Sequence, residues 1–254
     1  MKLIDEVNVL AEGLCQDYAL EHRFRFEPMF KYTRRTDLVH WLENSTVRLS
    51  SLQSYADDST VGGVGDPMEV LIGGLSAELK DPANPGYETV RHNLEKLLGM
   101  RVQSGGTLKV TTMTMRKPNI LSFCCSDRVT REAFERWNRV QGYDAVIRIH
   151  NIFHFVHAIL SADAKGEQRL KRFAALDPVQ YADFPLDFSR QRFPRLTFIK
   201  ERSQFEWQSE VRVLFGDRIP KDSTSQYYSL QIPNLDKLID IVEVPAHWSG
   251  SLHQ

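Results

Sequence analysis

The sequence predicts a single α+β domain with a mixed, mostly antiparallel central sheet, a helical insert and an N-terminal helix. Three observations lead to this prediction. Helical periodicity is confined to a few short segments, the second half of the chain is rich in strand-like segments, and neither an internal repeat nor a low-complexity linker divides the chain. The 254 residues are 42% hydrophobic and 26% charged, which is enough apolar material for one sizeable core. We therefore expect one domain over residues 1–254, with its core in residues 29–245.

The N-terminal part of the chain is expected to begin with a helical extension over residues 1–27. Apolar side chains recur there at helical spacing, at Leu3, Val7, Leu10, Leu14 and Tyr18. Pro28 separates this extension from a compact entry unit. That unit is predicted to contain a strand (29–32), a short helix that is capped by Thr36 and closes near Asn44, and a second strand (47–50).

Residues 66–100 are predicted to form a helical insert that could act as a lid over the sheet. One helix is expected from Met68 onward and another over residues 87–98, where apolar residues again recur at helical spacing. The second half of the chain is expected to supply most of the sheet and two helices. Strands are predicted near 108–115, 119–126, 145–149, 195–200, 205–215, 227–232 and 239–244, and helices are predicted from Thr130 to Gly142 and from Asn151 to Ile159.

Composition and charge exclude several classes of protein. The 32 Lys and Arg residues nearly balance 33 Asp and Glu, so no global field favours nucleic acid or a membrane surface. The cysteines (Cys15, Cys124 and Cys125) have no CxxC spacing and indicate neither a disulfide framework nor a zinc site. The N-terminus lacks the apolar core of a signal peptide, and no apolar run approaches the ~20 residues of a membrane span. We therefore expect a cytoplasmic protein without membrane contact.

The segment from Phe205 to Val213 has the strongest functional signal. Because side chains alternate along a strand, its polar face would carry two carboxylates, an amide and a guanidinium: Glu206, Gln208, Glu210 and Arg212. Trp207 is then expected on the opposite, apolar face, in the core. The polar face is also typical of a solvated sheet surface with cross-strand ion pairs, so the pattern alone assigns no function.

Six weak motifs follow one another along the chain. They are Lys31-Tyr32-Thr33-Arg34, Leu49-Ser50-Ser51, Asp66-Pro67, Leu121-Ser122, Trp137 with Gly142, and Lys200, Trp207, Glu210 and Arg212. In this order they resemble a large, uncharacterised bacterial family, a domain of unknown function, over about residues 29–245. The family has Asn, Met and Glu where this chain has Gly65, Arg136 and Gln208. With the last change, Gln208-Ser209-Glu210 is similar to the Gln/Glu-x-Glu strand of mono-ADP-ribosyltransferases.

The resemblance to mono-ADP-ribosyltransferases implies an enzyme that uses NAD as its substrate. Breaking the bond between nicotinamide and ribose builds oxocarbenium character on the ribose, as in glycoside hydrolysis. A fixed carboxylate near the ribose hydroxyls would stabilise that charge. The resemblance therefore implies Glu210 as the catalytic residue and Gln208 as the group that orients the acceptor.

The same resemblance implies the residues that bind NAD. Lys31 or Arg34 on the first strand would hold the pyrophosphate, for which a bidentate Arg is well suited. Tyr32 would stack on or hydrogen-bond the nicotinamide, and Ser122 would brace the site by hydrogen bonding. We expect Tyr32, Ser122 and Glu210 to lie within about one ligand length of each other. By analogy alone, the protein would be a bacterial toxin or anti-phage effector that acts on nucleic acid or protein.

Two alternatives stay open. One is a non-catalytic module of a bacterial defence system that binds a nucleotide or nucleic acid, and the other is a hydrolase of a nucleotide-linked ribose. Two basic stretches with interleaved aromatics would supply the nucleic-acid contacts, through Arg23, Arg25, Arg190, Arg192 and Arg195. No metal site is predicted, because the eight histidines are scattered and His154 and His157 have no third ligand near them in sequence. The sequence indicates no oligomeric state.

Overall fold

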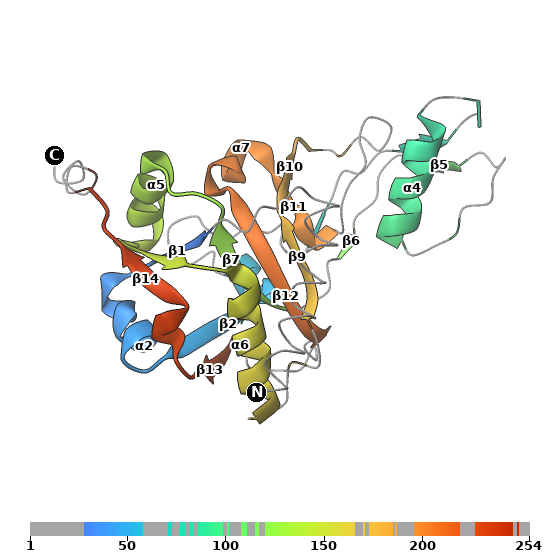
Figure 1. The fold of residues 1–254 in the computed structure, drawn as a ribbon. Coiled ribbons are helices and arrows are strands. Elements are labelled where there is room, and N and C mark those ends of the chain that lie inside the picture. The colour runs from blue at the N-terminus through green and yellow to red at the C-terminus, as the bar shows by residue number, and fades with distance from the viewer. Residues whose placement is uncertain are drawn as a thin grey trace.

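In the computed structural model of the protein, helices pack around one eight-stranded sheet in which the strand pairings are antiparallel (Figure 1). The prediction of an α+β fold with a mostly antiparallel central sheet is confirmed. The N-terminal helix predicted over residues 1–27 lies outside the residues that the structure describes. These are residues 28–57, 71–72, 77–79, 82–83, 86–98, 101, 108–110, 115–116, 120–165, 170, 173–184, 186, 196–218, 227–245 and 248.

The sheet is organised around β7 (Ile120–Ser126). This strand pairs with β12 (Glu210–Arg218) along one edge, and with both β2 (Thr46–Ser51) and β1 (Met29–Thr33) along the other. One edge of β7 is therefore shared between two partner strands. The sheet continues from β2 to β13 (Tyr227–Gln231), from β1 through β8 (Ala145–Ile149) to β14 (Ile239–Val242), and from β12 to β9 (Phe173–Pro178).

The two faces of β7 and β12 differ in chemistry. Arg212 lies opposite Cys124 and Glu210 lies opposite Ser126, so these four side chains share one face of the sheet. The other face is apolar and is covered by α6 (Ile152–Lys165), which crosses the sheet in Figure 1. Buried side chains from both layers form this core, among them Phe123, Val211, Val213, Phe215, Phe155 and Ile159.

Helix α5 (Arg131–Gln141) begins and ends where the sequence predicts. The Thr130 hydroxyl accepts a hydrogen bond from the Ala133 N–H (3.1 Å) and so caps the first turn. Gly142 adopts a left-handed conformation with φ of 66°, which glycine tolerates without a steric cost. Its N–H donates to Asn138 O (2.8 Å) and closes the last turn.

The remaining elements of the main body are short. They are the 3-10 turn η1 (Arg35–Asp37), α2 (Leu38–Leu42), α3 (Leu52–Asp57), β10 (Gln180–Ala182), η3 (Leu196–Phe198), β11 (Ile199–Glu201) and η5 (Leu235–Lys237). Strands β10 and β11 form a separate parallel pair. Of the helices in the described ranges, none has the length and apolar composition needed to cross a membrane.

The strand predicted over residues 205–215 begins only at Glu210, so the prediction is wrong for the residues before it. Those residues form α7 (Arg202–Phe205) and a 3-10 turn, η4 (Glu206–Gln208). Ser209 then takes a left-handed conformation, with φ of 44°, which turns the chain into β12. A positive φ is uncommon for serine, and alternation of polar and apolar residues gives no sign of such a turn.

The position predicted for Trp207 is also corrected. An i, i+4 ion pair between Arg202 and Glu206 (2.5 Å) favours a helical conformation of this segment over an extended one. Trp207 is half-buried and packs edge-on against Trp137, with 5.1 Å between the ring centroids. Its Nε1–H donates to Gln204 O (2.6 Å). Trp207 therefore lies beside α5, not in the core beneath α6.

The insert over residues 66–100 contains strands as well as a helix, which corrects the prediction of a helical insert. Helix α4 (Tyr87–Leu98) is present as predicted, but a strand lies where a helix from Met68 is expected. Two short antiparallel strand pairs involve the insert: β3 (Leu71–Ile72) with β6 (Met115–Arg116), and β4 (Ala77–Leu79) with β5 (Leu108–Val110). In Figure 1 α4 and β5 lie to one side of the main sheet.

Candidate functional site

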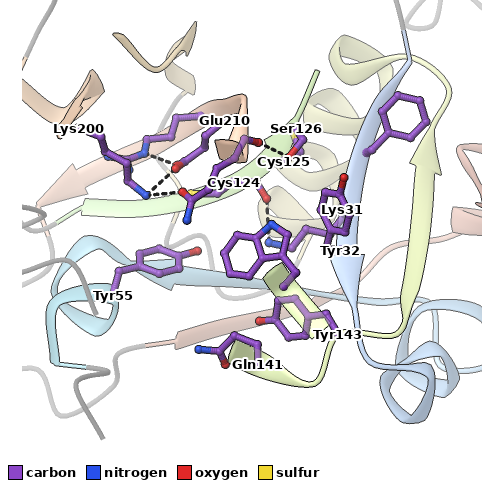
Figure 2. Close-up of a pocket in the computed structure, with 14 residues that line it drawn as sticks. Lys31, Tyr32, Tyr55, Cys124, Cys125, Ser126, Gln141, Tyr143, Lys200 and Glu210 are labelled. Carbon is purple, nitrogen blue, oxygen red and sulfur yellow. Dashed lines mark hydrogen bonds and ion pairs between the residues drawn. The ribbon is translucent and has the colours of Figure 1, made fainter. Parts of the chain in front are cut away.

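A cleft opens where β1 and β2 part along the edge of β7. Leu121 and Ser122 pair with β2 and Ser126 pairs with β1, so residues 123–125 pair with neither strand. The cleft at this fork has an empty volume of about 700 Å³, counted to its open mouth (Figure 2). Its described lining comes from β1, α3, β7, α5, β11, η4 and β12, and from the loop that follows α5.

The polar floor of the cleft is one carboxylate held between two cations. Glu210 Oε1 accepts a hydrogen bond from Arg212 Nε (2.6 Å), and Glu210 Oε2 lies 2.7 Å from Lys200 Nζ. Lys200 Nζ also donates to Gln208 Oε1 (3.0 Å), and Arg212 donates to Thr197 O. All five residues are buried, and Arg212 is only 1% exposed. Figure 2 shows Lys200 and Glu210 together at one end of the cleft.

This arrangement keeps Glu210 ionised. Burial alone would raise the pKa of the Glu210 carboxyl, but the adjacent Arg212 and Lys200 charges outweigh it and hold the pKa well below its usual range. The charged hydrogen bonds also fix the orientation of the carboxylate. The floor therefore presents a preorganised charge cluster whose parts depend on one another, because removing one would leave its partners buried without compensation.

Aromatic side chains form another wall of the cleft. Trp137 contacts both Tyr32 and Tyr143, with ring centroids 6.4 Å and 5.4 Å away. The Thr130 N–H donates to the Tyr32 hydroxyl (3.4 Å), and burial raises the pKa of Tyr32 to about 12, so the phenol stays neutral. Tyr55 from α3 also lines the cleft. Such flat apolar surfaces suit the stacking of a planar ring.

The two basic residues predicted on the first strand occupy different positions. Lys31 lines the cleft, and its Nζ donates to Cys124 O (2.8 Å), a contact that links β1 to the stretch of β7 at the fork. Arg34 is exposed, and its Nε donates to the backbone O of Gln141 (3.0 Å), a residue that lines the cleft. Lys31 is therefore inside the cleft, whereas Arg34 is at its rim.

Of the three residues expected to converge, Tyr32 and Glu210 line the same cleft. Ser122 is buried and donates to Ser50 O (3.1 Å), so it joins β7 to β2 next to the fork and is not part of the described lining. Gln208 does line the cleft although it precedes the strand, because Ser126 Oγ donates to Gln208 O (2.8 Å) and ties η4 to β7.

Cys124 lies in the cleft, yet we expect its thiol to be unreactive at neutral pH. Burial raises the pKa of Cys124 to about 11, and the nearby Glu210 charge acts in the same direction. At pH 7 about one thiol in ten thousand would then be ionised, and the thiolate is the reactive form. Iodoacetamide should label Cys124 in the folded protein far more slowly than in the urea-unfolded protein, as measured by mass spectrometry. Equal labelling rates in the two states would contradict this expectation.

Sequence reasoning did not assign three residues that define the cleft: Lys200, Arg212 and Trp137. The sequence did contain a signal for Arg212, because this residue follows Glu210 by two positions and a strand places both side chains on one face. Lys200 and Trp137 belong to the motifs that carry the family resemblance, but no local pattern relates them to Glu210. Their roles depend on contacts between β11, α5 and β12.

The structure does not describe the residues that are predicted to contact nucleic acid. The arginines proposed to contact nucleic acid all lie outside the described ranges: Arg23, Arg25, Arg190, Arg192 and Arg195. Within the described part of the chain, no group of three or more His, Cys, Asp or Glu side chains is arranged to hold a metal ion.

Comparison of the chain with protein-family models, curated proteins and solved structures gives no match. The geometry of the cleft is therefore the basis for assigning a function to the protein.

Proposed function

We propose that the cleft binds NAD and that the protein is an ADP-ribosyltransferase-like enzyme. The observation that carries this proposal is the ionised Glu210 carboxylate, held in one orientation in a cleft whose other wall is aromatic. A carboxylate can stabilise positive charge on a ribose, and the aromatic wall can hold the nicotinamide. Both groups line one cleft, so a ligand could contact them together.

The proposed reaction breaks one bond and forms another. The bond between nicotinamide N1 and ribose C1′ breaks, and its electron pair leaves with nicotinamide. An acceptor nucleophile then attacks C1′ and loses its proton to solvent or to a base. The Glu210 carboxylate stabilises the oxocarbenium character of the ribose between these two events. With water as the acceptor, the same steps release ADP-ribose.

The charge of the cleft supports an anionic ligand. Among the charged residues in its described lining, Lys31, Lys200 and Arg212 are cationic and Glu210 is anionic. A pyrophosphate would add two negative charges near this cationic excess, and guanidinium and ammonium groups both bind phosphate oxygens. Lys31 is the binding residue that we propose for the pyrophosphate, with Arg34 reaching it from the rim. The acceptor would be nucleic acid or protein, and a role as a toxin or anti-phage effector follows only by analogy with that class of enzyme.

The proposal is tested by titrating NAD into the purified protein in a calorimeter and by following nicotinamide release with and without cell extract as a source of acceptor. We expect saturable binding, and release that increases with extract. If NAD neither binds nor loses nicotinamide under either condition, the proposal is wrong.

A second candidate is a nucleotide-binding module without turnover, and one observation favours it. Both carboxylate oxygens of Glu210 already contact cations, Arg212 on one side and Lys200 on the other. This pairing reduces the negative charge that the carboxylate can offer to a ribose. Saturable NAD binding without nicotinamide release, with or without extract, would support the binding module over the enzyme.

A further inference from the structure

The aromatic wall of the cleft contains a polar atom that has no hydrogen-bond partner in the described part of the chain. The Trp137 Nε1 nitrogen is buried, and no acceptor among the described residues is within hydrogen-bond reach of it. Trp207, whose ring packs against Trp137, differs in this respect, because its Nε1–H donates to Gln204 O (2.6 Å). Buried donors in native proteins nearly always have an acceptor, so an exception in a binding cleft points to a ligand.

We propose that the Trp137 indole N–H recognises the carboxamide oxygen of a nicotinamide ring bound against the aromatic wall. This inference rests on the proposed function and adds the orientation of the ligand, with nicotinamide at Trp137 and the adjoining ribose at Glu210. Trp137 and Glu210 line the same cleft, from α5 and from β12. Trp137 then acts as a binding residue that selects the leaving group.

The neighbours of Trp137 fit this ring and not only its carboxamide. Tyr32 and Tyr143 both lie within ring-contact distance of Trp137, with ring centroids 6.4 Å and 5.4 Å from the Trp137 centroid. The nicotinamide of NAD is a cationic pyridinium, which aromatic faces attract. Gln141 follows Trp137 by four residues on α5 and also lines the cleft, so its carboxamide can meet the amide N–H₂ of the ligand. Figure 2 shows Gln141 and Tyr143 along the same side of the cleft.

Binding at this nitrogen requires a local adjustment. Protein atoms cover Trp137 Nε1, so the incoming oxygen must displace a neighbouring group. Rotamer changes of this kind are common at binding sites whose backbone moves little. The adjustment replaces a buried donor without an acceptor by a hydrogen-bonded one, which favours the bound state.

The test removes the N–H while keeping the shape of the ring. Trp137 is replaced by benzothienylalanine, in which sulfur takes the place of the indole N–H, and the same replacement at Trp207 is the matched control. Affinities are measured for nicotinamide mononucleotide, which carries the carboxamide, and for ADP-ribose, which lacks it. We expect the Trp137 variant to bind nicotinamide mononucleotide about 5- to 30-fold more weakly than wild type and to bind ADP-ribose unchanged. The Trp207 variant should bind both ligands as wild type does.

Two further measurements separate a ligand contact from a structural one. Because the Trp137 N–H has no acceptor among the described residues, its variant should keep the unfolding midpoint within about 2 °C of wild type or raise it, whereas loss of the Trp207 hydrogen bond should lower it. In ¹⁵N-labelled protein, the Trp137 indole proton resonance, assigned with Trp137→Phe, should move downfield when nicotinamide mononucleotide binds.

The outcomes are distinct. If wild type binds NAD and nicotinamide mononucleotide but the Trp137 variant does so equally well, the inference is overturned and the proposed function stands. Weakened ADP-ribose binding instead would place adenine at the wall and also overturn it. A midpoint that falls as far as that of the Trp207 variant would mean that the N–H bonds within the protein. If wild type binds none of these ligands, the proposed function and this inference fall together.

Discussion

Replacing Glu210 with Gln is expected to lower the release of nicotinamide from NAD by about 100-fold or more. The substitution keeps the shape of the side chain and removes its charge, and losses of this size are usual when a preorganised electrostatic group is removed. NAD affinity should stay within a few-fold of wild type, because the proposed contacts to pyrophosphate and nicotinamide involve other residues. Calorimetry and chromatographic detection of nicotinamide provide the two measurements.

The fold of this variant must be checked separately, because Glu210 also neutralises two buried cations. Turnover is therefore compared at a temperature where circular dichroism shows wild type and variant to be fully folded. The matched control is Glu206→Gln, which makes the same change at an exposed carboxylate paired with Arg202 and should leave turnover unaffected. If Glu210→Gln retains wild-type turnover, NAD chemistry would remain but Glu210 would not be the catalytic residue.

Replacing Arg212 with Met is expected to lower the free energy of unfolding by about 3–5 kcal/mol. Arg212 is 1% exposed, and its Nε bonds Glu210 Oε1 at 2.6 Å, so the variant leaves a buried carboxylate with one of its two cations removed. Removing one member of a buried ion pair usually has this effect, because the other charge stays buried. Replacing all members of the pair with apolar residues costs much less. Urea denaturation, with the slope compared between variants, provides the measurement.

The control for Arg212 is Arg148→Met. Arg148 forms an ion pair with Asp240 on the exposed surface between β8 and β14, with a side chain 47% exposed. Surface ion pairs contribute little, so this variant should unfold close to the wild-type midpoint. Equal stability of Arg212→Met and wild type would show that the floor of the cleft does not depend on its charge pairing.

The same ion pairs determine how acid affects stability. The pKa of Glu210 is lower in the folded than in the unfolded protein, because Arg212 and Lys200 outweigh the effect of burial. Its contribution to stability is therefore present above the unfolded pKa and is lost as the pH falls toward the folded pKa. In the Arg212→Met variant, ionised Glu210 contributes less to stability at neutral pH. The difference in the free energy of unfolding between wild type and variant should therefore decrease as the pH is lowered.

The sequence by itself determined those elements whose signals are local. The Thr130 cap and the Gly142 terminator delimit α5, and the strand over residues 145–149 has the predicted bounds. Hydrogen bonds within three or four residues and a left-handed glycine require no distant partner, so the sequence reveals them. Tyr32 and Glu210 could likewise be chosen as site candidates, and both line the cleft.

Only the tertiary structure decided how Ser209 turns the chain into β12 and which residues line the cleft. Alternation from Phe205 predicts a strand, but the Ser209 O accepts from Asp127 N–H (3.1 Å) and its hydroxyl from Arg128 Nε (2.8 Å), and these contacts come from a segment about 80 residues away along the chain. Lys200 reaches Glu210 from another strand, and the fork in the sheet depends on how β1 and β2 share one edge of β7. The free energies of this ion pair and of these strand pairings depend on which distant segments meet in space. The spacing of residues along a single sequence does not show which segments those are.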